Sequence, residues 1–241
     1  MNAIVSENLI NVIERIKRAA RRVGRDPSEV TLVAAAKSVE IKKLKEAISG
    51  GVRAIGENYV QEAAEKIKKI KDAAVKWHLI GHLQKNKAKI AVELFDVIES
   101  VDSIELAKEL NKRAQGQIEV FIEINIAKEK TKTGVTPDHA VKLAKEIAAL
   151  PNLTLTGLMC IPPASETPEG ARPYFVALRR LAERINKGHF PGVALKHLSM
   201  GMSSDYETAI EEGATIVRVG TAVFGERAEK AGKKTAGGKA H

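Results

Sequence analysis

Eight short apolar runs, separated by segments with helical periodicity, set the strongest limit on what this 241-residue chain can fold into. Each run is bounded by glycine, proline or polar residues, which is typical of buried strands. The expected strands lie at 31–37, 54–57, 76–81, 95–99, 118–126, 153–159, 195–199 and 215–219. Strands that alternate with helices about eight times, with no shift in composition, predict an α/β fold, a single TIM (β/α)8 barrel.

An extra helix is expected before the first strand. Residues 6–23 carry apolar side chains at helical spacing, with Ser6 as a candidate N-cap and Gly24 as a stop. We expect the barrel domain at 1–227, followed by a basic tail at 228–241 that is rich in Lys, Gly and Ala and disordered. The alternative is an open doubly wound sheet, which normally uses fewer strands and has a glycine-rich first turn that this sequence lacks.

The net charge of +9 raises the question of nucleic-acid binding. Residues 1–25 hold six Arg or Lys against two Glu, and residues 226–241 hold five against two, which leaves about +2 for the rest. Aromatic residues make up only 4% of the chain, so platforms for base stacking are scarce. The distribution argues against an RNA-binding module, and no nucleic-acid partner is expected.

The sequence also indicates the cellular compartment of the protein. No apolar run approaches the ~20 residues of a membrane span, and the N-terminus lacks the apolar core of a signal peptide. Cys160 is the single cysteine, so no internal disulfide can form, and we expect it to be a buried small residue at a strand end. These features predict a cytoplasmic protein with no membrane partner.

Lys37 closes the first expected strand, in the stretch Thr31 to Ser38, and is flanked by small residues. One interpretation is a desolvated, reactive amine; the commoner one is a lysine that extends into solvent. The loops after the last two strands favour the first, because Ser199 to Asp205 and Gly220-Thr221 combine glycines, hydroxyls and helix-start N–H groups that suit an anion. In TIM barrels a phosphate often lies on these two loops.

Arg218 lies near the end of the last expected strand, which neighbours the first strand in a closed barrel. An inward-facing Arg218 would therefore lie between Lys37 and the proposed phosphate loops. An amine, a phosphate cradle and a fixed cation across one mouth fit pyridoxal 5′-phosphate held as a Schiff base.

Other polar residues have plainer interpretations. His78 and His82 are four residues apart in an extended segment, which spans ~13 Å and is too far for one ion, so no metal is expected. Lys85, Lys87 and Lys89, with the lysines of 66–76, are expected on solvated helix faces. The segment Lys132-Thr-Gly134 is either a mobile lid or only a loop.

Six segments carry a more specific signal, and together they resemble the pyridoxal phosphate homeostasis protein family, relatives of the alanine racemase barrel domain. They are AAKS at 35–38, GENYVQE at 56–62, WHLIGHLQKNK at 77–87, GLM at 157–159, LSMGMS at 198–203 and VRVGTAVFG at 217–225. The resemblance runs from about Ile4 to Gly225, and six motifs in the right order make it specific.

The resemblance implies a single barrel with pyridoxal 5′-phosphate as a Schiff base on one lysine. The implied cofactor-binding residues are Lys37, Asn58, Ser199, Met200, Arg218, Gly220 and Thr221. Lys37 is the Schiff-base residue, Asn58 lies near the ring, Arg218 faces the pyridine nitrogen, and the other four hold the phosphate. His82 is given no role.

An arginine at the ring nitrogen disfavours its protonation and weakens the cofactor as an electron sink. A racemase also needs a second acid/base on the opposite face of its substrate, which the related racemases take from an additional domain. With the resemblance, this predicts a non-catalytic, monomeric protein that buffers pyridoxal phosphate and delivers it to apo-enzymes. The alternative is a monomeric amino-acid racemase that uses the same cofactor.

Overall fold

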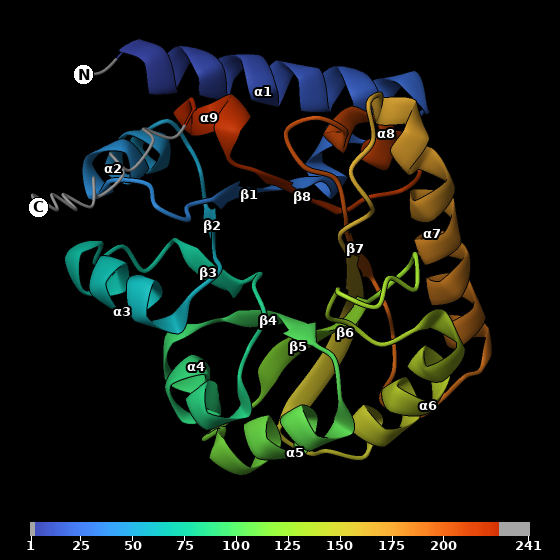
Figure 1. The fold of residues 1–241 in the computed structure, drawn as a ribbon. Coiled ribbons are helices and arrows are strands. Elements are labelled where there is room, and N and C mark those ends of the chain that lie inside the picture. The colour runs from blue at the N-terminus through green and yellow to red at the C-terminus, as the bar shows by residue number, and fades with distance from the viewer. Residues whose placement is uncertain (1–2, 227–241) are drawn as a thin grey trace, which may run out of the picture.

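The computed structural model describes residues 3–226, and the tail expected to be disordered at 228–241 lies outside them. Eight parallel strands form a closed barrel in chain order (Figure 1). The strands are β1 (Thr31–Ala35), β2 (Ala54–Glu57), β3 (Lys76–Leu79), β4 (Val97–Val101), β5 (Ile118–Ile124), β6 (Leu153–Cys160), β7 (His197–Ser199) and β8 (Ile216–Val219). Because β1 pairs with β8, the sheet has no free edge, which confirms the barrel and excludes the open sheet.

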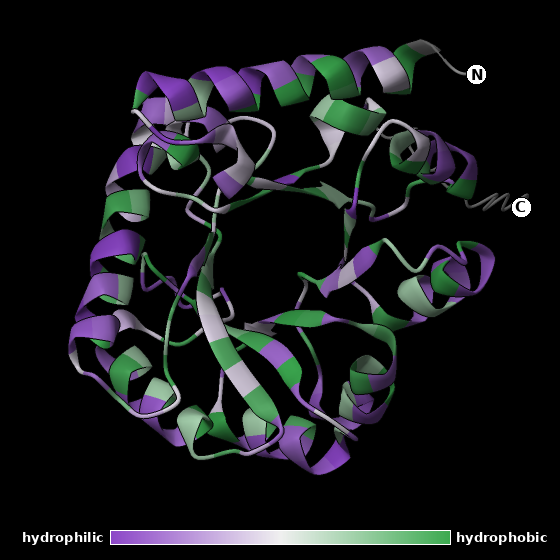
Figure 2. Cartoon of the chain, turned by 180° about the vertical axis from the view of Figure 1, so that it is seen from behind, coloured by the Kyte–Doolittle hydropathy of each residue, from purple (hydrophilic) through white to green (hydrophobic). Residues whose placement is uncertain are grey.

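Helices surround the barrel, and the extra N-terminal helix is present (Figure 1). They are α1 (Ala3–Arg22), α2 (Ile41–Ser49), α3 (Val60–Lys69), α4 (Ala88–Leu94), α5 (Ile104–Arg113), α6 (Pro137–Ala148), α7 (Arg172–Lys187), α8 (Tyr206–Glu211) and α9 (Thr221–Phe224). Hydrophobic and hydrophilic residues alternate along these helices in Figure 2, as expected for helices with one buried and one exposed face. No helix in the described range is long and apolar enough to cross a membrane.

The barrel interior is filled by its own small apolar cluster. Its buried members are Val33, Ala54, Ile80, Val97, Phe121, Met159 and Ile216. Side chains alternate between the two faces of a strand, so a residue two positions beyond an interior residue also points inward. This alternation places Arg218 inside the barrel, two positions after Ile216, and Glu99 two positions after Val97. Both side chains are buried.

Several predicted boundaries were wrong. Strand β1 ends at Ala35, so Lys37 lies in the turn that follows and does not close the strand. Ser6 lies inside α1 and cannot be its N-cap. The strand predicted at 95–99 runs from Val97 to Val101, because the Phe95 N–H still bonds to the Ala91 carbonyl at the end of α4. The prediction for Cys160 is confirmed, since it is buried and ends β6.

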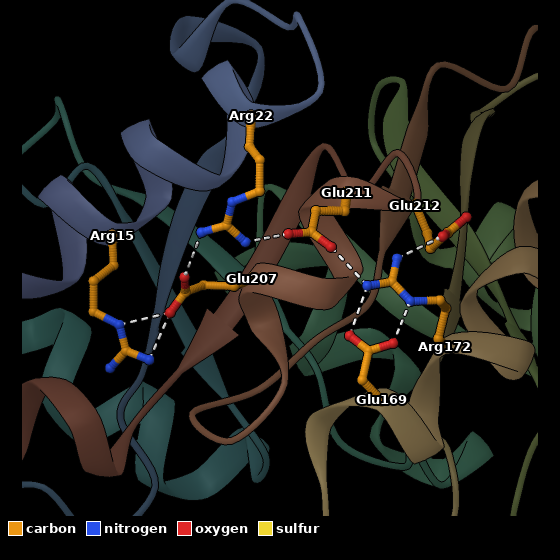
Figure 3. A network of polar contacts seen from close by, with 7 residues as sticks. All are labelled: Arg15, Arg22, Glu169, Arg172, Glu207, Glu211 and Glu212. Carbon is orange, nitrogen blue, oxygen red and sulfur yellow. Dashed lines mark hydrogen bonds and ion pairs between the residues drawn. The ribbon is translucent and has the colours of Figure 1, made fainter.

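Helix α1 crosses the outside of the barrel beside α8 and α9 (Figure 1). It is joined to α8 by ion pairs from Arg15 to Glu207 and from Arg22 to Glu207 and Glu211 (Figure 3). Arg172, at the start of α7, continues this network on the other side of α8. Helix α8 begins directly after the loop that follows β7, so the network holds the outer end of that loop.

Candidate functional site

Lys37 lies at the centre of a tight turn at the C-terminal end of β1. The Val39 N–H donates to the Ala36 carbonyl over 2.9 Å, which closes a four-residue turn around Lys37 and Ser38. The Lys37 side chain is half-buried, and its Nζ lies 5.2 Å from the centre of the Tyr59 ring. The amine therefore lies between β1 and the loop after β2, next to an aromatic face.

Asn58 directly follows β2 and borders the same mouth of the barrel. The loop after β3 passes close to it: a Cβ atom at Gly81 would lie 2.5 Å from the Asn58 carbonyl oxygen. Only glycine allows this approach. A cavity of about 350 Å³ opens here, lined by Asn58, Tyr59, Gly81 and His82 among others.

Arg218 is the buried cation of the site. Its side chain is 4% exposed, and it donates to the Ser199 hydroxyl over 2.7 Å and to the Cys160 carbonyl over 2.8 Å. Within residues 3–226, no carboxylate oxygen lies within the 4.0 Å of an ion pair to this guanidinium. Arg218 thus brings a positive charge beneath the mouth, and no carboxylate of the described residues pairs with it directly.

A polar layer inside the barrel supports Arg218. The Ser199 hydroxyl donates onward to Glu99, and Glu99 is 2.6 Å from Nδ1 of His78. Burial pushes the pKa of Glu99 up, but the bond and charge of His78, the charge of Arg218 and the bond from Ser199 outweigh it and hold the pKa below its ordinary value. An ionised Glu99 then accepts from Ser199 and His78, so their protons point toward it.

The loops after β7 and β8 are joined to each other. The Ala222 N–H donates to the Ser203 hydroxyl over 3.2 Å, and Gly201 takes a φ of +90° that favours glycine. The Met200 N–H donates to the Ile216 carbonyl over 3.1 Å, so it is occupied by the sheet. Thr221 is the first residue of α9, where backbone N–H groups lack partners within the helix.

Gly220 brings the β8 loop against the end of β1. A Cβ atom at Gly220 would lie 3.1 Å from the Ala35 carbonyl oxygen, two residues before Lys37. The structure thus brings the predicted site residues to one mouth, at the carboxyl ends of four consecutive strands: β7, β8, β1 and β2. Two of them face the site less directly than predicted, since the Ser199 hydroxyl and the Met200 N–H are already bonded within the barrel.

Sequence reasoning missed the residues beneath the site and misplaced one lysine. Lys66 was predicted on a solvated face but is buried, and it pairs with Glu57 and Glu62 at 2.7 Å each. The signal was available, because Lys66 continues the buried stripe of α3 that contains Val60 and Ala63. Burial raises the pKa of Glu57 to about 7, although its bond to Lys66 acts in the opposite direction.

Comparison with known proteins identifies the family of this chain. The family model described as alanine racemase, N-terminal domain, matches residues 8–228. A protein of Aquifex aeolicus named pyridoxal phosphate homeostasis protein is 46% identical over 230 residues, which cover 94% of this chain and 99% of the relative. The chain belongs to the pyridoxal phosphate homeostasis protein family. The Escherichia coli K12 protein of that name is 41% identical over 233 residues, covering 92% and 97% of the two chains.

Solved structures share the fold of this chain. PipY of Synechococcus elongatus, whose structure is described as having PLP bound, is 37% identical with a TM-score of 0.77, covering 89% of this chain and all (100%) of PipY. The alanine racemase of Corynebacterium glutamicum is 18% identical with a TM-score of 0.70, and the match covers 91% of this chain and 62% of the racemase. At that identity the racemase is similar in fold alone.

Proposed function

We propose that this protein binds pyridoxal 5′-phosphate at the C-terminal mouth of the barrel, buffers it, and delivers it to apo-enzymes. The observation that carries the proposal is the contact between the β8 loop and the end of β1. There Gly220 approaches Ala35, so the Lys37 amine, the start of α9 and the buried Arg218 share one mouth. The PLP-bound structure of PipY supports the choice of cofactor.

The donor set suits this cofactor. When bound, pyridoxal 5′-phosphate supplies an aldehyde that condenses with a primary amine to a Schiff base, and Lys37 is the amine at this mouth. Gly220 and Thr221 would hold the phosphate with N–H groups and a hydroxyl. Arg218 would face the ring nitrogen as a donor, with Asn58 beside the ring. A cationic, donor-rich mouth matches an anionic ligand with an acceptor nitrogen.

Two predicted residues act less directly in this proposal. The Ser199 hydroxyl accepts from Arg218 and donates to Glu99, so its side chain fixes the guanidinium. The Met200 N–H is bonded to Ile216, so Met200 shapes the loop after β7 and does not offer this N–H to the phosphate.

One experiment distinguishes the carrier function from the alternative, a monomeric racemase. The loaded protein is freed of excess cofactor and mixed with an apo-aminotransferase. A carrier restores transaminase activity and racemises alanine no faster than free pyridoxal phosphate. Racemisation well above the free cofactor would show an enzyme and contradict the carrier. We also propose that the carrier is a monomer, and light scattering that gives twice the mass of 26.1 kDa would contradict this.

A further inference from the structure

The turn that carries Lys37 rests on a buried cluster of charges. Lys66 on α3 is 6% exposed, and its Nζ donates to three oxygens at 2.7 Å each: the Ala36 carbonyl, Glu57 Oε1 and Glu62 Oε1. Glu57 is the last residue of β2 and is fully buried. The cluster therefore connects the ends of β1 and β2 to α3.

The same cluster holds the backbone on both sides of Lys37. Before Lys37, the Ala36 carbonyl accepts from Lys66. After it, the Ser38 N–H donates to Glu62 Oε1 over 2.7 Å. The two peptide groups that flank the Lys37 Cα are thus bound to one lysine and one glutamate of α3. The direction in which the Lys37 side chain leaves the turn depends on both.

The turn needs such support because the backbone conformation of Ser38 is unfavourable for a residue other than glycine. Ser38 has a φ of +61°, a left-handed conformation that favours glycine in the third position of a turn. A residue in this conformation persists when its surroundings hold it there. Besides the Val39 N–H bond that closes the turn, the bonds from Ser38 to Glu62 and from Lys66 to the Ala36 carbonyl hold it there.

Packing alone does not account for the cluster. A buried ion pair adds little net stability over apolar side chains of the same volume. An apolar residue at position 66 would continue the buried stripe of α3, yet the residue there is a lysine whose amine bonds to Ala36 in the turn at the end of β1. One of its three bonds ends on the Ala36 carbonyl next to Lys37, and another ends on Glu62, which accepts from the Ser38 N–H on the other side of Lys37. These contacts point to a role in orienting Lys37.

We propose that Lys66 and Glu62 are positioning residues for Lys37, fixing the turn so that the amine is presented to the cofactor aldehyde. This inference rests on the proposed function. Removing the Lys66 amine should let the turn sample other conformations, so fewer encounters find the amine in a reactive position. The cofactor should still bond to Lys37, but about tenfold more slowly or worse.

The test compares Lys66→Met with the control Lys69→Met, an exposed lysine on the same helix. Two quantities are measured: hydrogen exchange of the peptide that contains residues 36–39 without cofactor, and the rate at which pyridoxal phosphate becomes fixed to Lys37 by borohydride. We expect faster exchange and slower fixation in Lys66→Met, and wild-type values in Lys69→Met. Wild-type exchange and fixation in a folded Lys66→Met protein would overturn the proposal.

A second variant covers the case in which Lys66→Met does not fold. Glu62→Gln keeps an oxygen for Ser38 but removes the charge that pairs with Lys66, so we expect a smaller change in the same directions. An unchanged Glu62→Gln protein would overturn the role of Glu62. If wild type fixes no cofactor on Lys37 although the variants exchange faster, the proposed function fails while the turn is still shown to be held by the cluster.

Discussion

Arg218 donates a hydrogen bond of 2.7 Å to the hydroxyl of Ser199, inside the barrel and beneath its C-terminal mouth. The same hydroxyl donates to Glu99, so one small side chain separates a buried cation from a buried anion. In a direct salt bridge a carboxylate would lie against the guanidinium and offset its field. The hydroxyl between them fixes Arg218 without that direct contact.

Replacing Ser199 with alanine should loosen Arg218. The substitution removes an acceptor from the guanidinium and a donor from Glu99, both buried, so we expect a loss of about 1–3 kcal/mol in the free energy of unfolding. Affinity for pyridoxal phosphate should fall because the guanidinium is less well fixed. Urea denaturation and a binding titration measure the two effects. Ser204→Ala, at an exposed position of the following loop, is the control, and equal behaviour of the two variants would contradict this role.

Glu57 should make the stability depend on pH near neutrality. Its pKa is about 7 in the folded protein and near its ordinary 4.5 when unfolded, so folding favours the protonated carboxyl. The stabilisation is complete below pH 4.5 and is lost as the pH rises through 7. The wild type should lose on the order of 2–3 kcal/mol between pH 5 and pH 8 through this residue.

Glu57→Gln isolates that contribution, because the difference between its unfolding free energy and that of wild type cancels the other titrating groups. As the pH rises, Glu57→Gln should become more stable relative to wild type. Glu65→Gln, exposed on α3, should show no such trend. A constant difference for Glu57→Gln between pH 5 and pH 8 would mean that Glu57 titrates outside this range.

Arg172 should contribute more to the free energy of unfolding than an ordinary surface arginine does. It pairs with Glu169, Glu211 and Glu212, and Glu211 also pairs with Arg22 of α1 (Figure 3). We expect Arg172→Ala to cost about 1–2 kcal/mol of unfolding free energy, with a smaller cost in high salt. Thermal unfolding of this variant beside Arg180→Ala, an exposed position of the same helix, measures it. Equal melting temperatures would show that the network adds nothing.

The fold was predictable because eight apolar runs at regular intervals leave few architectures. The shared mouth was predictable for the same reason, since carboxyl ends of parallel strands meet at one face of a barrel. Lys66 was not predicted, because a lysine in a charged helix was assigned to solvent although it continues the buried stripe of α3. Its pairing with carboxylates of β2 and α3 shows only in the folded chain. The hydrogen bond that the Ser199 hydroxyl donates to Glu99 was not predictable, because the two residues lie 100 positions apart in the sequence.

The most direct test of the account is whether pyridoxal phosphate bonds to Lys37. Purified wild type, Lys37→Ala and the control Lys42→Ala, an exposed lysine on α2, are mixed with the cofactor, and absorbance spectra are recorded before and after borohydride. The account predicts a Schiff-base band near the blue edge of the visible for wild type and Lys42→Ala. After reduction, the cofactor should be found on the peptide that contains Lys37. Lys37→Ala should show neither, and a band with covalent fixation in that variant would contradict the account.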